Sequence, residues 1–149
     1  MLRELHIRNF ALLEDARLQL REGFNCLTGE TGVGKSLVLG ALDLLLGGRP
    51  RPDLVRKGAD SLCVQGLFHA ASPRILADVA DAVGFPLEDG VCDILLEREY
   101  HPSGRNRCRV NGKPVSVAAL RGTGERLVDI HGQQEHESLL HRANQRALL

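Results

Sequence analysis

The segment that decides the fold is Gly29-Glu30-Thr31-Gly32-Val33-Gly34-Lys35-Ser36, which fits the phosphate-loop pattern GxxxxGK[ST] at every fixed position. Glycines let the backbone curl, so that successive N–H groups approach phosphate oxygens without a Cβ in the way. Lys35 supplies a point charge for β- and γ-phosphates, and the Ser36 hydroxyl is a ligand suited to Mg²⁺. The segment therefore predicts a site for a nucleoside triphosphate and its magnesium ion.

The residues on either side of this loop have the pattern that phosphate binding requires. Phe24 to Thr28 is short and mostly apolar, which predicts a strand running into the loop. After Lys35, apolar residues recur at three- and four-residue steps, which predicts a helix that ends at Gly47-Gly48. The helix would direct the positive end of its dipole at the bound anion. A glycine-rich turn that merely caps a helix is the weaker interpretation, because it would not need this context.

Composition indicates a globular chain of 149 residues, with 43% hydrophobic and 26% charged residues. The formal net charge of zero does not indicate a surface that coats nucleic acid by charge alone. Met1 to Phe10 lacks the apolar core of a signal peptide, and the longest apolar run, Leu37 to Leu46, is too short to span a bilayer. We expect a soluble, cytoplasmic protein.

Apolar patterns elsewhere predict an α/β fold with a β-rich second half. Strands are expected at Leu2–Ile7, Leu18–Leu20, Leu62–Phe68, Ile94–Glu99, Arg107–Val110 and Leu127–Ile130, with a break at Asn9-Phe10. Helices are expected after the N-cap Ser72 and over Val117–Leu120. Asn111-Gly112 predicts a tight turn.

The phosphate loop indicates a nucleotide but not its use. The chain has no guanine-reading NKxD string, which argues against a GTPase. Ile94–Glu97 and Leu127–Asp129 only approximate the buried strand and paired acids of a hydrolase. A small kinase would carry an arginine-rich lid, and Arg105-Asn106-Arg107, with only two arginines, is the candidate for it. A self-contained small-molecule kinase and a binding module with a vestigial loop therefore stay open as alternatives.

Leu5-His6-Ile7-Arg8-Asn9-Phe10, followed by the phosphate loop, resembles the N-terminal lobe of SMC-like and Rad-fifty-like ATPase heads. Three later strings are similar to a DNA-repair branch of that family: Val55-Arg56-Lys57-Gly58-Ala59, Arg107-Cys108-Arg109-Val110-Asn111-Gly112-Lys113-Pro114-Val115 and Leu127-Val128-Asp129-Ile130-His131-Gly132-Gln133-Gln134-Glu135-His136. The resemblance runs from Met1 to about Leu140.

The resemblance implies a split ABC-type ATPase head. Residues 1–140 would be its N-terminal lobe, a mixed sheet around the phosphate-loop helix with an antiparallel β flank, and residues 141–149 would begin the helix leading to a coiled coil. A C-terminal lobe would carry the signature and Walker B motifs. The implied function is the ATP-binding half of a head that acts in DNA double-strand-break repair and recombination. Its partners would be that C-terminal lobe, a second head and DNA, with direct DNA contact by this lobe left open. A nucleoid-associated location follows.

The resemblance also implies roles for individual residues. ATP and Mg²⁺ would be held by Gly29, Glu30, Thr31, Gly32, Val33, Gly34, Lys35, Ser36 and Leu37. Gln133 would be the Q-loop residue that reaches Mg²⁺ and the attacking water, with Gln134 as the fallback; Lys35 and Gln133 would be catalytic. Arg8 and Asn9 would lie near the ribose and α-phosphate, or form an ordinary strand end. Arg56 would meet the γ-phosphate or the opposing head, or be a surface arginine.

Other polar residues give weaker signals. The spacing of His131, His136 and His141 does not place them on one helical face, so zinc is not expected. The cysteines, at positions 26, 63, 92 and 108, are predicted to be small buried residues in a reducing compartment. Arg98, Arg105, Arg107 and Arg109 lie on a predicted hairpin, which would place the last three on one side. That side is a solvated sheet face or a contact for DNA phosphates.

Overall fold

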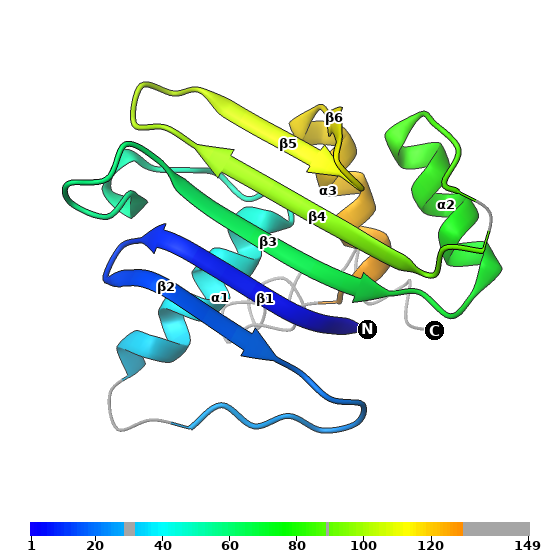
Figure 1. Cartoon of the computed structure of the whole chain (residues 1–149), viewed down its shortest axis with the longest axis horizontal. Helices are drawn as coiled ribbons and strands as arrows, with labels where there is room; N and C mark the ends of the chain where they lie inside the picture. Colours follow the sequence, from blue (N-terminus) through cyan, green and yellow to red (C-terminus); the bar gives the residue numbers. More distant parts are fainter. Residues whose placement is uncertain (29–31, 89, 130–149) are drawn as a thin grey trace, which may run out of the picture.

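The computed structural model describes residues 1–28, 32–88 and 90–129 (Figure 1). The strands are β1 (Leu2–Phe10), β2 (Leu13–Gln19), β3 (Leu62–His69), β4 (Asp93–Tyr100), β5 (Asn106–Val110) and β6 (Lys113–Val115). The helices are α1 (Gly32–Leu45), the short 3₁₀ helix η1 (Pro52–Leu54), α2 (Pro73–Val83) and α3 (Val117–Leu127).

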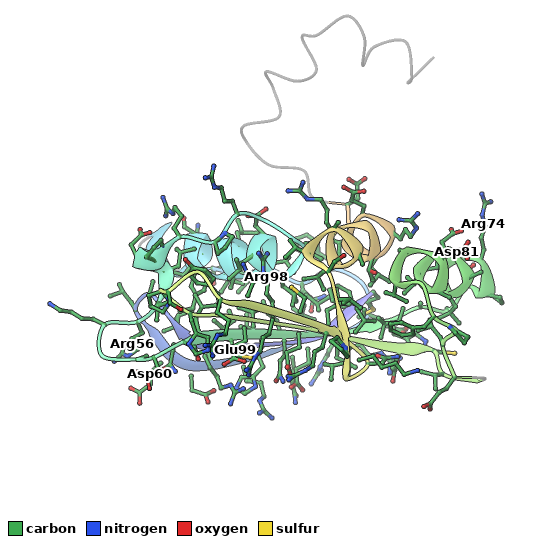
Figure 2. All side chains as sticks on the ribbon, turned by 90° about the horizontal axis from the view of Figure 1, so that it is seen from above. Arg56, Asp60, Arg74, Asp81, Arg98 and Glu99 are labelled. Atoms are coloured by element: carbon green, nitrogen blue, oxygen red, sulfur yellow. The ribbon has the colours of Figure 1, made fainter. Side chains whose placement is uncertain are left out.

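The described strands form one six-stranded sheet in the order β2-β1-β3-β4-β5-β6, and each neighbouring pair is antiparallel. Figure 2, a view along the sheet, shows α1, α2 and α3 on one face, while polar side chains project from the other. The sheet therefore has a covered face and an open face, as the alternation of buried and exposed residues along β3 and β4 requires.

The core lies between the covered face and the helices. Leu62, Val64 and Phe68 of β3 and Ile94 and Leu96 of β4 are completely buried. Ala41, Leu44 and Leu45 of α1 pack against them. Burial of the carboxyl half of α1 fixes this helix across the middle of the sheet.

Two termination signals in the sequence are confirmed. Gly47 has a φ of 98° and its N–H bonds the Leu44 carbonyl, while the Gly48 N–H bonds the Asp43 carbonyl. These two hydrogen bonds form the Schellman motif that ends many helices. Likewise Asn111 and Gly112, with φ of 48° and 77°, form the two-residue turn between β5 and β6.

The predicted antiparallel flank is present, but the segments expected to add strands beside the phosphate loop are not strands. Phe24–Thr28 is irregular and exposed, and it pairs with no described strand. Leu127 ends α3 instead of opening a strand, and Ile130 lies outside the described residues. Within the described ranges the sheet is thus antiparallel throughout, and the parallel part of the expected mixed sheet is not found there. β1 also continues through the predicted break to Phe10: Asn9 has a φ of 53°, but Arg8 and Phe10 on either side of it pair with Asp15 and Leu13 of β2.

α3 is longer than the short helix predicted at Val117–Leu120. Ser116 caps it by accepting a hydrogen bond from the Ala119 N–H, and the Thr123 hydroxyl donates to the Ala119 carbonyl. Gly124 is buried and lies against Leu46, where a Cβ would come within 2.9 Å of the Leu46 Cδ2. The glycines of this segment therefore permit close helix packing instead of breaking the helix. In the described part of the chain, no helix has the length and apolar character needed to cross a membrane.

Candidate nucleotide-binding site

The amino end of α1 carries the last two residues of the phosphate loop, Lys35 and Ser36. α1 begins at Gly32, and Lys35 and Ser36 lie exposed in its first turn. The first N–H groups of a helix have no partner within it and point toward its positive dipole end. An ammonium, a hydroxyl and free amides thus meet at one exposed helix end, which is the donor set that a polyphosphate requires. Gly29, Glu30 and Thr31 lie outside the described residues.

The rest of α1 positions this end. Gly40 lies against the ring of Phe10: a Cβ on this glycine would be 3.6 Å from the Phe10 Cζ. Leu37 is half-buried and packs against the core. Its side chain therefore supports the helix, which leaves its backbone as the part available to a nucleotide.

Arg8 and Asn9 both lie on β1, but Asn9 is half-buried whereas Arg8 is exposed. Arg8 is exposed on the open face, opposite to α1, and pairs in register with Cys63 of β3. A hydrogen bond with the Cys63 thiol raises the pKa of Arg8. Burial raises the pKa of that thiol, against the lowering effect of Arg8. In this conformation the structure does not bring the Arg8 side chain together with Lys35, and the predicted contact with the nucleotide stays a prediction.

Arg56 is anchored to the turn between β1 and β2. Its Nη1 donates to the Leu12 carbonyl over 3.0 Å, and its Nη2 lies 3.5 Å from a Glu14 carboxylate oxygen. Its backbone N–H bonds the carbonyl of Asn9. Arg56 thus ties the segment after η1 to the end of β1, whatever further contact it makes with a phosphate.

The segment before the loop exposes apolar side chains. Phe24 is 93% exposed and Leu27 is 48% exposed. Between them, the Asn25 side chain accepts from the Arg21 N–H and donates to the carbonyls of Arg21 and Gly23. A local turn thus uses these backbone groups, while Phe24 within it and Leu27 after it are exposed in the described part of the chain.

Arg98 belongs to the predicted hairpin, but no side of the sheet was predicted for it. It is 1% exposed on the covered face of β4. Its Nη1 donates to the carbonyls of Leu44 and Gly48, at 2.6 and 2.7 Å, where α1 ends. The signal was in the alternation, since Ile94, Leu96, Arg98 and Tyr100 share one side of the strand.

The neighbouring arginines of the hairpin do lie on the open face. Arg107 is paired with Glu99, and Arg109 with Glu97, across β4 and β5. Burial alone would raise the pKa of Glu97, but hydrogen bonds from Gln65 and Arg109 outweigh burial and lower it. The predicted common side of Arg107 and Arg109 is confirmed, and their charges are neutralised by acidic neighbours. Arg105 precedes β5 in the connecting turn.

The cysteine prediction was wrong for two of four residues. All four are free; Cys108 is buried and Cys63 is half-buried, but Cys26 and Cys92 are exposed. Cys26 lies in the exposed segment before the loop, and Cys92 lies just before β4. Where the structure describes the chain, no three His, Cys, Asp or Glu side chains are grouped to hold a metal ion. Gln133, Gln134, His131, His136 and His141 lie outside the described residues.

Comparison with known proteins gives the family. A family model described as an AAA domain matches residues 4–145. The chain belongs to the AAA domain family. It is 42% identical over 149 residues to the DNA repair protein RecN of Halalkalibacterium halodurans, covering 100% of this chain and 26% of that protein. It is 40% identical over 149 residues to the DNA repair protein RecN of Bacillus subtilis, again covering 100% and 26%. The resemblance predicted from the sequence is confirmed.

Solved structures confirm the fold class. A chain described under "Structural biochemistry of ATP-driven dimerization and DNA stimulated activation of SMC ATPases" superposes with a TM-score of 0.73 at 20% identity, covering 99% of this chain and 96% of that one. The recombination mediator protein RecF-ATP gives 0.69 at 24% identity, covering 97% and 35%. The SMC head domain from Thermotoga maritima gives 0.66 at 21% identity, covering 95% and 51%. The kinase alternative receives no support from these relatives.

The chain spans about a quarter of the length of the RecN proteins it matches, 26% in both cases. Activities, substrates and partners of those whole proteins therefore apply to this chain only as proposals.

Proposed function

We propose that this chain is the ATP-binding half of an SMC-like ATPase head that acts in DNA double-strand-break repair and recombination. The observation that carries the proposal is the complete phosphate loop at the exposed amino end of α1, with Lys35 and Ser36 together in the first turn. Proteins named for DNA repair match the chain over its whole length, which supports the biological setting.

Each element of the loop has a distinct task in this proposal. The glycine-rich backbone and the first amides of α1 hold the phosphate oxygens, and the helix dipole adds attraction for their charge. The Lys35 ammonium neutralises the β- and γ-phosphates, and the Ser36 hydroxyl is a ligand for Mg²⁺. Mg²⁺ would be held in part by the Ser36 hydroxyl and would supply positive charge to offset that of the phosphates. Gln133 as Q-loop residue, and Arg8 and Asn9 beside the ribose, stay predictions.

Hydrolysis needs residues whose motifs are missing from this sequence. A hydrolase of this type uses a Walker B carboxylate to hold Mg²⁺ and orient the water. No convincing Walker B or signature string stands in the sequence. We propose that a C-terminal lobe supplies them, and that it covers the apolar surface at Phe24 and Leu27. The chain alone should bind ATP weakly and hydrolyse it negligibly.

The further partners follow from the same family. A related SMC ATPase is described as undergoing ATP-driven dimerization and DNA-stimulated activation. We propose that two heads of the present kind likewise sandwich ATP, so that ATP joins the heads and hydrolysis releases them. Because the substrate of repair is DNA, the proposal places the protein at the nucleoid. The ion pairs that neutralise Arg107 and Arg109 argue against the open sheet face as a DNA-binding surface.

The test is a titration with Mg-ATP, read by the amide signals of Gly34, Lys35 and Ser36 in an NMR spectrum. Lys35→Ala should abolish binding. Lys113→Ala is the matched control, because Lys113 is exposed on β6 whereas α1 packs on β1, β3 and β4. Unchanged affinity in Lys35→Ala would defeat the assignment. Turnover by the chain alone at the rate of an intact head would defeat the need for a second lobe.

A further inference from the structure

A single buried arginine joins the carboxyl end of α1 to two strands of the sheet. Arg98, on the covered face of β4, donates from Nη1 to the carbonyl oxygens of Leu44 and Gly48 at 2.6 and 2.7 Å. Its Nε donates to the Asn106 side-chain oxygen on β5 at 3.1 Å. Figure 2 places Arg98 on the side of the sheet that the helices cover. The guanidinium therefore links α1, β4 and β5 at one point.

Burial removes the Arg98 cation from water, which costs free energy, so interactions within the fold must offset this cost. Burial lowers the pKa of Arg98, and the charge of Asp43 opposes this effect. The last carbonyls of a helix carry a partial negative charge that attracts a cation, and the guanidinium fork can serve several acceptors at fixed angles. An apolar residue of similar volume would often serve stability as well as a buried charge does. What the arginine adds is a fixed position for the end of α1.

That position matters because the two ends of α1 differ in support. Its carboxyl half is buried, whereas Lys35 and Ser36 at the amino end are exposed. The eight residue-to-residue steps from Ser36 to Leu44 span about 12 Å of helix, so a tilt of about 10° at the anchored end would move the phosphate loop by about 2 Å. A displacement of about 1 Å at a binding constellation can already cost about 100-fold.

We propose that Arg98 is a positioning residue for nucleotide binding. It fixes the carboxyl end of α1 against β4 and β5, so that the phosphate loop at the other end keeps the geometry that polyphosphate requires. This inference rests on the proposed function, since it assumes that the loop binds a nucleotide.

The experiment measures Mg-ATP affinity in Arg98→Met, Arg98→Lys and wild type, well below the unfolding temperature of each. Circular dichroism verifies that each sample is folded. Arg98→Met should lose about 10- to 100-fold in affinity while folded, and Arg98→Lys should recover most of it, because an ammonium can still reach the two carbonyls. Arg107→Met, on the open face of the same hairpin, is the control and should bind as wild type does.

A residue that serves only stability would change the unfolding temperature but not the affinity of the folded chain. Wild-type affinity in folded Arg98→Met would therefore overturn the inference. Should Arg98→Met not fold, Asn106→Ala removes only the Nε acceptor and should cost about 3-fold in affinity. Unchanged affinity in folded Asn106→Ala would then overturn it. If wild type itself does not bind Mg-ATP, both the proposed function and this inference are wrong. If wild type binds Mg-ATP but the Arg98 variants bind it equally well, only this inference is wrong.

Discussion

Gly66 of β3 faces Leu45 of α1 so closely that a Cβ on the glycine would lie 2.6 Å from the Leu45 Cδ2. The same Cβ would lie 2.9 Å from the Phe68 ring. Gly66 interrupts the row of buried side chains formed by Leu62, Val64 and Phe68. The missing side chain makes room for α1, which crosses the sheet at this point with its carboxyl end buried.

We therefore predict that Gly66→Ala destabilises the chain by about 1–3 kcal/mol, because buried neighbours must shift to admit one methyl group. Denaturation by urea, followed by circular dichroism, measures the change. Gly122→Ala is the matched control: it lies in α3, where a Cβ would meet only ordinary contacts, 3.4 Å or more away. That substitution should be neutral or stabilise by up to about 1 kcal/mol. A neutral Gly66→Ala would show that α1 is not held close to β3.

A second prediction concerns acid stability. The pKa of Glu97 is lower in the folded chain than its ordinary value, because hydrogen bonds from Gln65, at 2.6 Å, and Arg109 outweigh burial. A lowered folded pKa means that the ionised carboxylate stabilises the fold. This contribution is fully present above the unfolded pKa of about 4.3 and is lost as pH falls through the folded value.

Wild type should therefore be more stable than Glu97→Gln at pH 6, and the difference should shrink as the pH drops below about 4. Unfolding midpoints at a series of pH values measure it. Glu22→Gln, in the exposed loop after β2, should show no such trend. A constant difference between wild type and Glu97→Gln down to pH 3 would contradict the role of this carboxylate.

The third prediction separates the role of the Ser36 side chain from that of Lys35. Ser36→Ala should leave binding of metal-free ATP nearly unchanged, since Lys35 and the amides remain. It should weaken the gain in affinity that Mg²⁺ gives, because the hydroxyl ligand is lost. Parallel titrations with and without Mg²⁺ provide the comparison. An equal Mg²⁺-dependent gain in Ser36→Ala and wild type would remove Ser36 from the metal site.

Signals that act over a few residues predicted their structures well. The helix end needs a positive φ at Gly47, and the tight turn needs one at both Asn111 and Gly112; glycine and asparagine are the residue types that adopt it most readily. The alternation along β3 and β4 likewise follows from one covered face. For the same reason the position of Lys35 and Ser36 at a helix start could be predicted, since motif and periodicity lie within one segment.

Predictions that depended on distant contacts did less well. Phe24–Thr28 is apolar, but a strand also requires a neighbour, and the described sheet offers it none. The full length of α3 was not predicted, because Gly122 and Gly124 are residues that disfavour a helix. The helix is stabilised by packing on Leu46, which no local sequence pattern indicates. The burial of Arg98 was not predicted, because a charged side chain usually indicates exposure. Its acceptors are the carbonyls of Leu44 and Gly48, which are 54 and 50 residues away along the chain.

The last prediction tests whether the apolar segment before the phosphate loop is a docking surface. Phe24 is 93% exposed, so it buries almost no area within the described part of this chain. Phe24→Ser should therefore change the stability of the chain by no more than about 0.5 kcal/mol. If the C-terminal lobe covers this side chain, the same substitution should weaken association of the two lobes by about 10-fold or more, as loss of a buried aromatic anchor does.

Association of the chain with a separately expressed C-terminal lobe, measured by calorimetry, together with the ATPase activity of the mixture, gives both readouts. Leu95→Thr is the control, because Leu95 is partly exposed on the open face of β4, away from α1, and threonine keeps the preference for a strand. It should leave association and activity as in wild type. A Phe24→Ser chain that binds the lobe as tightly as wild type would mean that this segment stays uncovered, and the second lobe would have to dock elsewhere.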